Sequence, residues 1–153
     1  MSPSLTLDPA SDRLRILYVE DLPELRRIVA RILELDEHTV ITAPNGADAH
    51  HLLAAAPDAF DLVITDHCMP VMNGLDLVAC LRALRFRGKV VVLSCVSDPE
   101  VRAAYRGFHV DALLDKPVTA DELRATLHRL FAPVEVDLFR VPLPRAHTSS
   151  PFN

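Results

Sequence analysis

Several features are scarce in this chain of 153 residues, and each scarcity excludes a class of protein. Aromatic residues make up only 5% of the sequence, and there is no tryptophan. The three cysteines are odd in number and lack CxxC spacing, which argues against a disulfide framework. No apolar segment approaches the roughly 20 residues that span a bilayer, and the N-terminus lacks a signal-peptide pattern. We therefore expect a soluble, cytoplasmic protein with no membrane partner.

Clusters of basic residues are also missing. The 16 lysines and arginines are scattered along the chain, and the formal net charge is −5. Proteins that bind the phosphate backbone of nucleic acids need grouped positive charge. We therefore expect no nucleic-acid partner.

The apolar residues that are present are mostly Leu, Val, Ala and Ile, and hydrophobic residues form half of the chain. This mixture is typical of helices packed on buried parallel strands. A chain of this length usually forms one domain and buries about 68–70% of its unfolded surface. We expect residues 13–131 to form that domain, preceded by a flexible segment at residues 1–12.

Apolar runs alternate with helical patterns along residues 13–131. The runs that predict strands are Leu14–Val19, His38–Ala43, Phe60–Thr65, Lys89–Ser94 and Val110–Leu114. The patterns that predict helices begin near Pro23, Asn45, Gly74, Asp98 and Thr119, and the third is expected to reach Phe86. Such alternation predicts right-handed βαβ units, and thus a doubly wound α/β fold with a five-stranded parallel sheet.

Polar residues follow the ends of four predicted strands. They are Glu20-Asp21 after the first, Asp66 after the third, Ser94 at the end of the fourth, and Lys116 after the fifth. The carboxyl ends of parallel strands share one edge of the sheet, where open α/β sheets bind their ligands. The sequence therefore predicts one crevice that holds carboxylates, a hydroxyl and an ammonium group.

The chemistry of such a crevice is constrained by its charge. Two carboxylates about 4 Å apart repel by about 4 kcal/mol at an effective dielectric near 20, so three either raise a pKa or recruit a cation. Oxygen ligands that leave room for water and phosphate suit Mg²⁺. A carboxylate such as Asp66 can attack a phosphoryl group, whose oxygens Lys116 and Ser94 would stabilise.

At residues 13–131 the chain resembles the receiver domain of two-component response regulators. The landmarks that carry the resemblance occur in order, as Glu20-Asp21, Asp66, Met69-Pro70, Asn73-Gly74, Ser94 and Lys116-Pro117. The resemblance implies the flavodoxin-like (βα)5 receiver fold with strand order 2-1-3-4-5. It also implies a cis peptide bond between Lys116 and Pro117.

The resemblance assigns roles to six residues. Asp66 would be the phosphoacceptor, Ser94 the switch hydroxyl, and Lys116 the partner of the phosphoryl group. Asp21 would bind Mg²⁺ directly and Glu20 through water, while Asp66 and the backbone carbonyl of Cys68 complete the protein ligands. The domain would catalyse its own phosphorylation and dephosphorylation through an aspartyl phosphate, without being an enzyme in the ordinary sense.

Two residues near the fifth strand depart from the family pattern. Leu113 stands where an aromatic side chain usually moves inward with the switch hydroxyl, which puts the usual coupling in doubt. His109 replaces a glycine that accepts positive φ, and we expect the loop to follow a different path. Near the acceptor, we expect His67 to be a solvated loop side chain. We also expect nearby acids to raise the thiol pKa of Cys68 and Cys95, which disfavours their reactivity.

The remaining residues, 132–153, contain four prolines. We expect a tail without an output domain, in which residues 134–141 are the only candidate for a strand or docking peptide. With this resemblance, we expect the chain to be a single-domain response regulator, phosphorylated by a sensor histidine kinase or a histidine phosphotransfer protein. It would act on an unknown downstream protein, and form a homodimer through the face of helix four, strand five and helix five.

Other functions remain open at this point. The chain is alternatively a receiver-fold scaffold whose binding ignores phosphorylation, or a receiver fragment of a larger regulator. An aspartyl-nucleophile hydrolase is a third alternative, but that class generally requires a second acid two residues after the nucleophile. Cys68 occupies that position.

Overall fold

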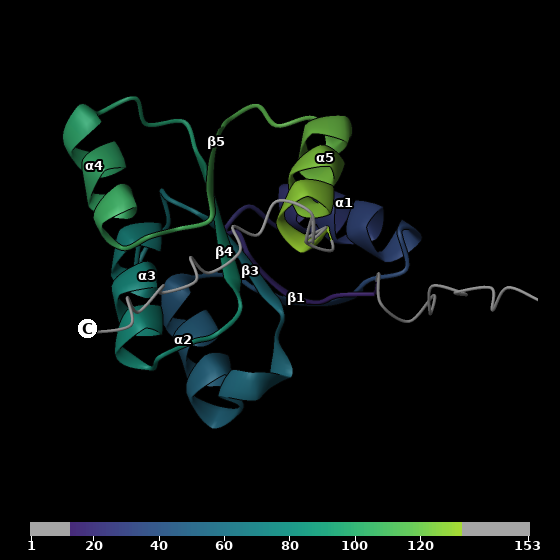
Figure 1. Ribbon diagram of the computed structural model, residues 1–153, viewed down its shortest axis with the longest axis horizontal. Coiled ribbons are helices and arrows are strands. Elements are labelled where there is room, and N and C mark those ends of the chain that lie inside the picture. Colours follow the sequence, from purple (N-terminus) through teal and green to yellow (C-terminus); the bar gives the residue numbers. More distant parts are fainter. Residues whose placement is uncertain (1–12, 133–153) are drawn as a thin grey trace, which may run out of the picture.

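The computed structural model describes residues 13–132, which form a parallel sheet between two layers of helices (Figure 1). The strands are β1 (Arg15–Val19), β2 (Thr39–Ala43), β3 (Leu62–Asp66), β4 (Lys89–Ser94) and β5 (Ala112–Asp115). The helices are α1 (Pro23–Leu35), α2 (Gly46–Ala55), α3 (Gly74–Ala83), α4 (Pro99–Gly107) and α5 (Ala120–Phe131), with a short 3-10 helix, η2 (Pro57–Ala59). The strand order β2-β1-β3-β4-β5 confirms the predicted doubly wound fold.

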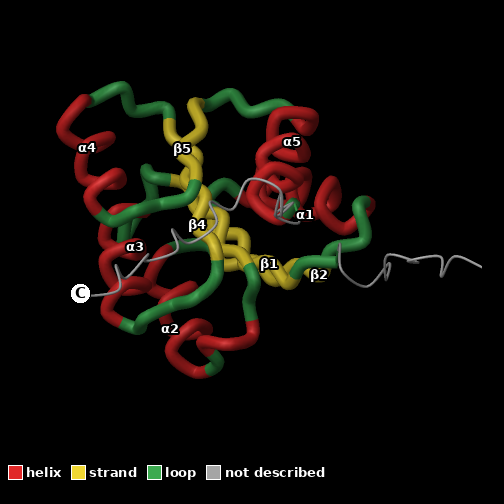
Figure 2. Tube along the Cα trace, in the orientation of Figure 1, coloured by secondary structure: helices red, strands yellow, loops and turns green. Residues whose placement is uncertain are grey.

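The two faces of the sheet have separate cores, which the alternating side chains of its strands divide between them. Helices α1 and α5 cover one face, where Tyr18 and Ile64 pack with Leu33 and Leu127. Helices α2, α3 and α4 cover the other, where Leu17 and Val63 belong to the second core (Figures 1 and 2). Coverage of both faces explains why the central strands are almost wholly apolar.

The predicted strands are all present, with shifts of one or two residues at most ends. The central strand β3 is buried along its whole length, whereas the edge strand β2 is mostly exposed. Asp66 is the last residue of β3 and pairs with Leu93 of β4. The parallel register therefore brings the carboxyl ends of β1, β3 and β4 to one edge of the sheet.

The helices begin where the sequence predicts, because their first turns have suitable caps. The side chains of Asn45, Asp98 and Thr119 each accept a hydrogen bond from a backbone N–H of the helix that follows. Thr119 and Glu122 form a complete capping box. Helix α1 has Pro23 at its first position, as predicted, and no side-chain cap.

Helix α3 is shorter than predicted. It ends at Ala83, three residues before the expected end at Phe86. Arg85 has a φ of 56°, which turns the chain so that the backbone N–H of Phe86 donates to the carbonyl of Leu81 at 3.0 Å. This turn places Phe86 in the core, where it is 6% exposed. Burial of Phe86 thus ends the helix, although no glycine marks the turn.

The expectation that His109 diverts its loop was wrong at the level of the backbone. His109 has a φ of 56°, the left-handed conformation for which glycine is usually chosen. The turn is held by Arg82 of α3, whose guanidinium donates to the carbonyls of Phe108 and His109 at 2.7 and 3.0 Å. These bonds help to hold a conformation that His109 adopts less readily than glycine.

Some predictions concern segments outside the described residues. These are the flexible N-terminal segment at residues 1–12, and the strand or docking peptide at residues 134–141 of the tail. Among residues 13–132, none of the helices combines the length and the apolar character that a membrane span requires.

Candidate functional site

Three carboxylates gather at the carboxyl edge of the sheet. Glu20 and Asp21 directly follow β1, and Asp66 ends the neighbouring strand β3. One oxygen of each of these three residues lies within 4.8 Å of the others. Glu20 is fully buried and Asp66 is 5% exposed, so water screens their charges poorly. The structure thus brings together the three acids predicted as metal ligands, in a donor set of oxygens that suits Mg²⁺.

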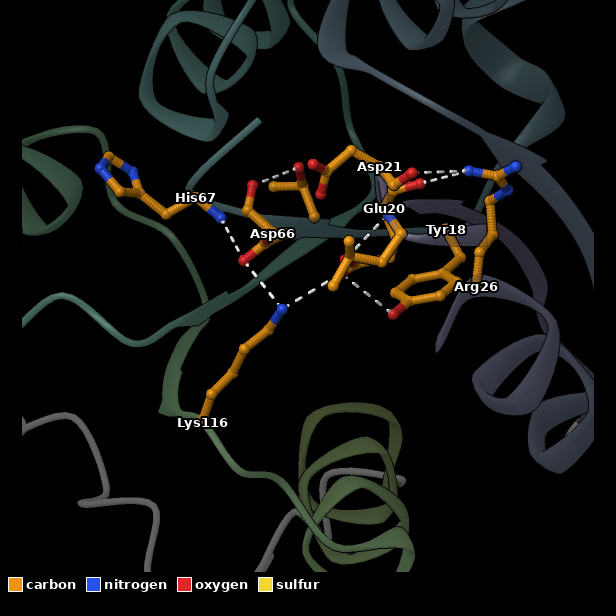
Figure 3. Close-up of polar contacts among 9 residues, drawn as sticks. Tyr18, Glu20, Asp21, Arg26, Asp66, His67 and Lys116 are labelled. Atoms are coloured by element: carbon orange, nitrogen blue, oxygen red, sulfur yellow. Dashed lines mark hydrogen bonds and ion pairs between the residues drawn. The ribbon is translucent and has the colours of Figure 1, made fainter. Parts of the chain in front are cut away.

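Lys116 lies between two of these acids (Figure 3). Its Nζ atom is 3.1 Å from Oδ1 of Asp66 and 3.2 Å from Oε2 of Glu20. The side chain is placed by β5, because the backbone N–H of Lys116 donates to the carbonyl of Ser94 at 2.9 Å, one residue after the strand ends. The Lys116-Pro117 peptide bond is cis, as the resemblance predicted.

Burial and mutual repulsion shape the charges of this cluster. Burial raises the pKa of Glu20, and the nearby Asp66 carboxylate raises it further, although Lys116 opposes both. Burial alone would lower the pKa of Lys116, but attraction to Asp66 and Glu20 outweighs it, and the net shift is upward. Lys116 therefore stays charged, while the metal-free site disfavours a full complement of charged acids.

Asp66 is held by backbone atoms around it. Its Oδ1 accepts a hydrogen bond from the backbone N–H of His67 at 2.8 Å, in addition to the contact with Lys116. Gly74, at the start of α3, allows the loop to close tightly. A Cβ atom at this position would lie 2.4 Å from the carbonyl oxygen of Asp66. Asn73 caps the helix and fixes where this close approach occurs.

Ser94 is the last residue of β4 and directly follows Leu93, the residue that pairs with Asp66 of β3. The side chain is 2% exposed. Its Oγ accepts a hydrogen bond from the backbone N–H of Val96 at 3.0 Å. The hydroxyl therefore closes a local turn within the β4–α4 loop.

His67 is not the solvated side chain that the sequence predicts. Its Nδ1 atom forms a short hydrogen bond with the hydroxyl of Tyr105, and the two rings meet edge to face with their centroids 5.4 Å apart. Tyr105 comes from α4 and is fully buried. Its hydroxyl also lies near Gly74, where an added Cβ atom would come within 2.8 Å. Helix α4 is thus linked directly to the residue after Asp66.

The contact between His67 and Tyr105 cannot be predicted from the sequence, because 38 residues separate the two side chains. Tyr105 reads as one apolar position on the buried side of α4. A Tyr differs from Phe or Leu there because its buried hydroxyl requires a polar partner. That requirement is the one signal in the sequence, and it does not name His67.

Two further residues belong to the surroundings of the site. Leu113 is half-buried in β5, opposite Val92 of β4, and packs against the core beneath α2, α3 and α4. Cys68 lies in the β3–α3 loop, two residues after Asp66, and its side chain is exposed. Burial still raises the pKa of the Cys68 thiol, and the neighbouring Cys95 thiol and the Asp66 carboxylate raise it further.

Comparisons with known proteins agree with this geometry. The sensor histidine kinase TmoS of Ectopseudomonas mendocina is 39% identical over 124 residues, which cover 80% of this chain and 12% of TmoS. The transcriptional regulatory protein TcrA of Mycobacterium tuberculosis is 35% identical over 136 residues, which cover 88% of this chain and 50% of TcrA. This chain therefore spans half or less of the length of both relatives.

Solved structures show the same fold. The chemotaxis protein CheY4 of Vibrio cholerae superimposes with a TM-score of 0.68 and is 28% identical, over 76% of this chain and 98% of CheY4. The family model for the response regulator receiver domain matches residues 16–128, from β1 to the last turns of α5. The chain therefore belongs to the response regulator receiver domain family, whose members act in two-component signalling.

Proposed function

We propose that this chain accepts a phosphoryl group on Asp66 with the help of Mg²⁺, and signals by changing its protein–protein interactions. Residues 13–131 would be the receiver unit, acting as a single-domain response regulator. The observation that carries the proposal is the cluster itself, in which three carboxylates lie within 4.8 Å and Lys116 contacts Asp66 at 3.1 Å. A sensor histidine kinase or a histidine phosphotransfer protein would supply the phosphoryl group.

The proposed chemistry assigns one task to each side chain. Asp66 Oδ1 is already bonded to Lys116 and to the His67 N–H, which leaves Oδ2 to attack phosphorus while the bond to the donor nitrogen breaks. Lys116 would move its contact to the incoming phosphoryl oxygens, where it offsets charge that develops during transfer.

The proposed metal site uses residues that fit Mg²⁺. Asp21 and Asp66 would bind the ion directly, Glu20 through water, and the backbone carbonyl of Cys68 would complete the protein ligands. When bound, Mg²⁺ neutralises charge on the phosphoryl oxygens. Burial, and then the neighbouring Asp66 carboxylate, raise the pKa of Glu20, and this supports the assignment because a cation stabilises carboxylates that are buried close together.

Ser94 would carry the signal away from Asp66 in the usual direction. Its hydroxyl would leave the N–H of Val96 and donate to a phosphoryl oxygen, which changes the β4–α4 loop. The side chain of Leu113 cannot then reproduce the inward movement that an aromatic ring makes with the switch hydroxyl. We infer that the pair of His67 and Tyr105 supplies a second link, because it joins the residue after Asp66 to α4. The output surface would be the face of α4, β5 and α5, either toward a partner or in a homodimer.

One observation favours a second candidate function. Because Leu113 stands in place of the aromatic residue, the chain is alternatively a scaffold whose binding is independent of phosphorylation. A receiver unit within a larger regulator is a further alternative, since the relatives TmoS and TcrA are longer than this chain. The scaffold and the regulator differ in whether phosphorylation changes assembly or binding.

Intact-mass spectrometry after incubation with acetyl phosphate and Mg²⁺ tests the proposal. We expect a single phosphoryl adduct that is lost in Asp66→Asn and in excess EDTA, and a change in assembly by light scattering. The absence of any adduct would overturn the proposal and favour the scaffold. An adduct without any change in assembly or partner binding would contradict the signalling half alone.

A further inference from the structure

A groove lies at the amino edge of the sheet, between the end of α3 and the turn that joins α4 to β5. Its volume is about 540 Å³, and its lining includes Arg82, Phe86, Arg87, Phe108 and Asp111. Arg82 ties the two sides of the groove together, because its Nε donates to the carbonyl of Phe108 at 2.7 Å. We call this hollow the amino-edge groove.

The amino-edge groove carries positive charge that remains unpaired among residues 13–132. No acidic side chain of these residues forms an ion pair with Arg82 or Arg87. The acid that lines the groove, Asp111, is already engaged, since it accepts from the N–H of Val90 at 2.8 Å and lies 3.8 Å from Lys89. In a chain with a formal net charge of −5, this groove favours an anionic occupant.

Helix α5 ends beside the amino-edge groove. A second hollow, of about 360 Å³, is lined by Phe131, the last residue of α5, together with Phe60 and Lys89. The two hollows share Arg87 and Gly88 in their linings. The chain that follows Phe131 therefore starts within reach of Arg87.

Six residues of that following chain match the amino-edge groove in charge and in pattern. They read Val134-Glu135-Val136-Asp137-Leu138-Phe139. Apolar and acidic residues alternate as far as Leu138, so an extended conformation would place both acids on one side and the apolar residues on the other. Glu135 is four residues after Phe131, which an extended chain spans in about 13 Å.

We propose that residues 134–139 dock in the amino-edge groove of their own chain. Their two acids would pair with Arg82 and Arg87, and their apolar side chains would contact Phe108. A single exposed ion pair contributes little, but the short connection to α5 keeps the segment at a high effective concentration beside the groove. Docking would cover the turn between α4 and β5, and it does not depend on phosphorylation of Asp66.

Amide hydrogen exchange on the full chain tests the docking. We expect the backbone amides of residues 134–139 to exchange more slowly than those of an unstructured peptide. Arg87→Glu should speed their exchange by about fivefold or more, the effect of losing about 1 kcal/mol of stabilisation. The matched control is Arg27→Glu, which changes an exposed arginine of α1 that has no acid partner among residues 13–132 and should leave the rates unchanged.

Charge changes in the segment itself separate docking from an effect on the fold. Glu135→Lys combined with Asp137→Lys leaves residues 13–132 intact and should speed exchange as Arg87→Glu does. Glu135→Arg added to Arg87→Glu should restore slow exchange, because it re-forms a pair with the opposite polarity.

Three results would overturn the proposal. Exchange of residues 134–139 at the rate of an unstructured peptide would leave the groove to an acidic segment of another protein. Slow exchange that ignores both Arg87→Glu and the double lysine variant would mean that the segment contacts a different surface. Slow exchange that develops only as the protein concentration rises would mean that a second copy supplies the segment.

Discussion

The acidic residues at the amino and carboxyl edges of the sheet differ in their cationic partners. At the amino edge, Asp61 precedes β3 and accepts hydrogen bonds from the backbone and guanidinium of Arg15 at 2.8–3.2 Å. Asp111 precedes β5, accepts from the N–H of Val90 at 2.8 Å and lies 3.8 Å from Lys89. Each of these acids has its own cation. At the carboxyl edge, three acids cluster, and two of them, Glu20 and Asp66, share the ammonium group of Lys116.

This difference separates structural charges from charges available for ligands. Arginine lowers the pKa of Asp61 by hydrogen bonding, whereas burial and the neighbouring carboxylate raise the pKa of Glu20. Ionised Asp61 therefore stabilises the fold, and ionised Glu20 destabilises it until a cation is present. The pKa shifts of Asp61 and Glu20 have opposite signs. This difference indicates that the carboxyl edge is suited to binding a ligand rather than to stabilising the fold.

The largest expected effect comes from removing the one ammonium group of the cluster. Lys116→Ala should slow phosphorylation of Asp66 by acetyl phosphate by about 100-fold, because charge on the phosphoryl oxygens then lacks its partner. Lys89→Ala, at the amino edge, is the matched control and should leave the rate unchanged. The rates are measured by intact mass over time. A wild-type phosphorylation rate in Lys116→Ala would contradict the proposed difference between the carboxyl and amino edges.

Val96 is expected to affect how fast water removes the phosphoryl group at the carboxyl edge. Its side chain offers no polar group to orient an attacking water molecule, so we expect slow loss of the phosphoryl group. Val96→Glu should shorten the half-life of the phosphorylated protein by about tenfold, less than full general-base catalysis contributes. The decay is followed by intact mass after removal of acetyl phosphate. An equal or longer half-life in the variant would show that Val96 does not protect the adduct.

Neutralising one crowded acid should stabilise the metal-free protein. Glu20→Gln should raise Tm at pH 7 in EDTA by about 4 °C, the shift that about 1 kcal/mol produces in a domain of this size. Because the pKa of Glu20 is raised, the native state holds its proton more tightly than the unfolded state. The destabilisation therefore develops as pH rises through the native pKa, and the gain from Glu20→Gln should vanish below about pH 4. In saturating Mg²⁺, Glu20→Gln should instead lower Tm.

The smallest expected effect lies at the amino edge and has the opposite sign. Asp61→Asn should lower the free energy of unfolding by less than about 1 kcal/mol, because its partner Arg15 is largely exposed. The pKa of Asp61 is lowered, so its contribution is present above about pH 4 and is lost as pH falls through the native value. Urea unfolding at pH 7 and pH 3 measures the loss. A stabilising Asp61→Asn would contradict the comparison.

Local chemistry explains which parts of this molecule the sequence predicts well. Helix starts at Asn45, Asp98 and Thr119 depend on the capping residue and a few neighbours, so they are readable. The gathering of Glu20, Asp21 and Asp66 is also readable, because parallel strands place their carboxyl ends together.

Features that depend on distant parts of the chain were missed. Helix α3 ends early because Arg85 takes a positive φ and Phe86 enters the core, which no local residue signals. His67 meets Tyr105 only after α4 has packed beside α3. Both misses are cases in which tertiary packing decides a local conformation.

The most direct test of the central claim is to find which acid carries the phosphoryl group. Borohydride reduces an aspartyl phosphate to homoserine, and peptide mapping locates the product. After incubation with acetyl phosphate and Mg²⁺, we predict homoserine at position 66 alone. Modification of Asp21 or Glu20 in its place, or an unmodified Asp66, would contradict the account.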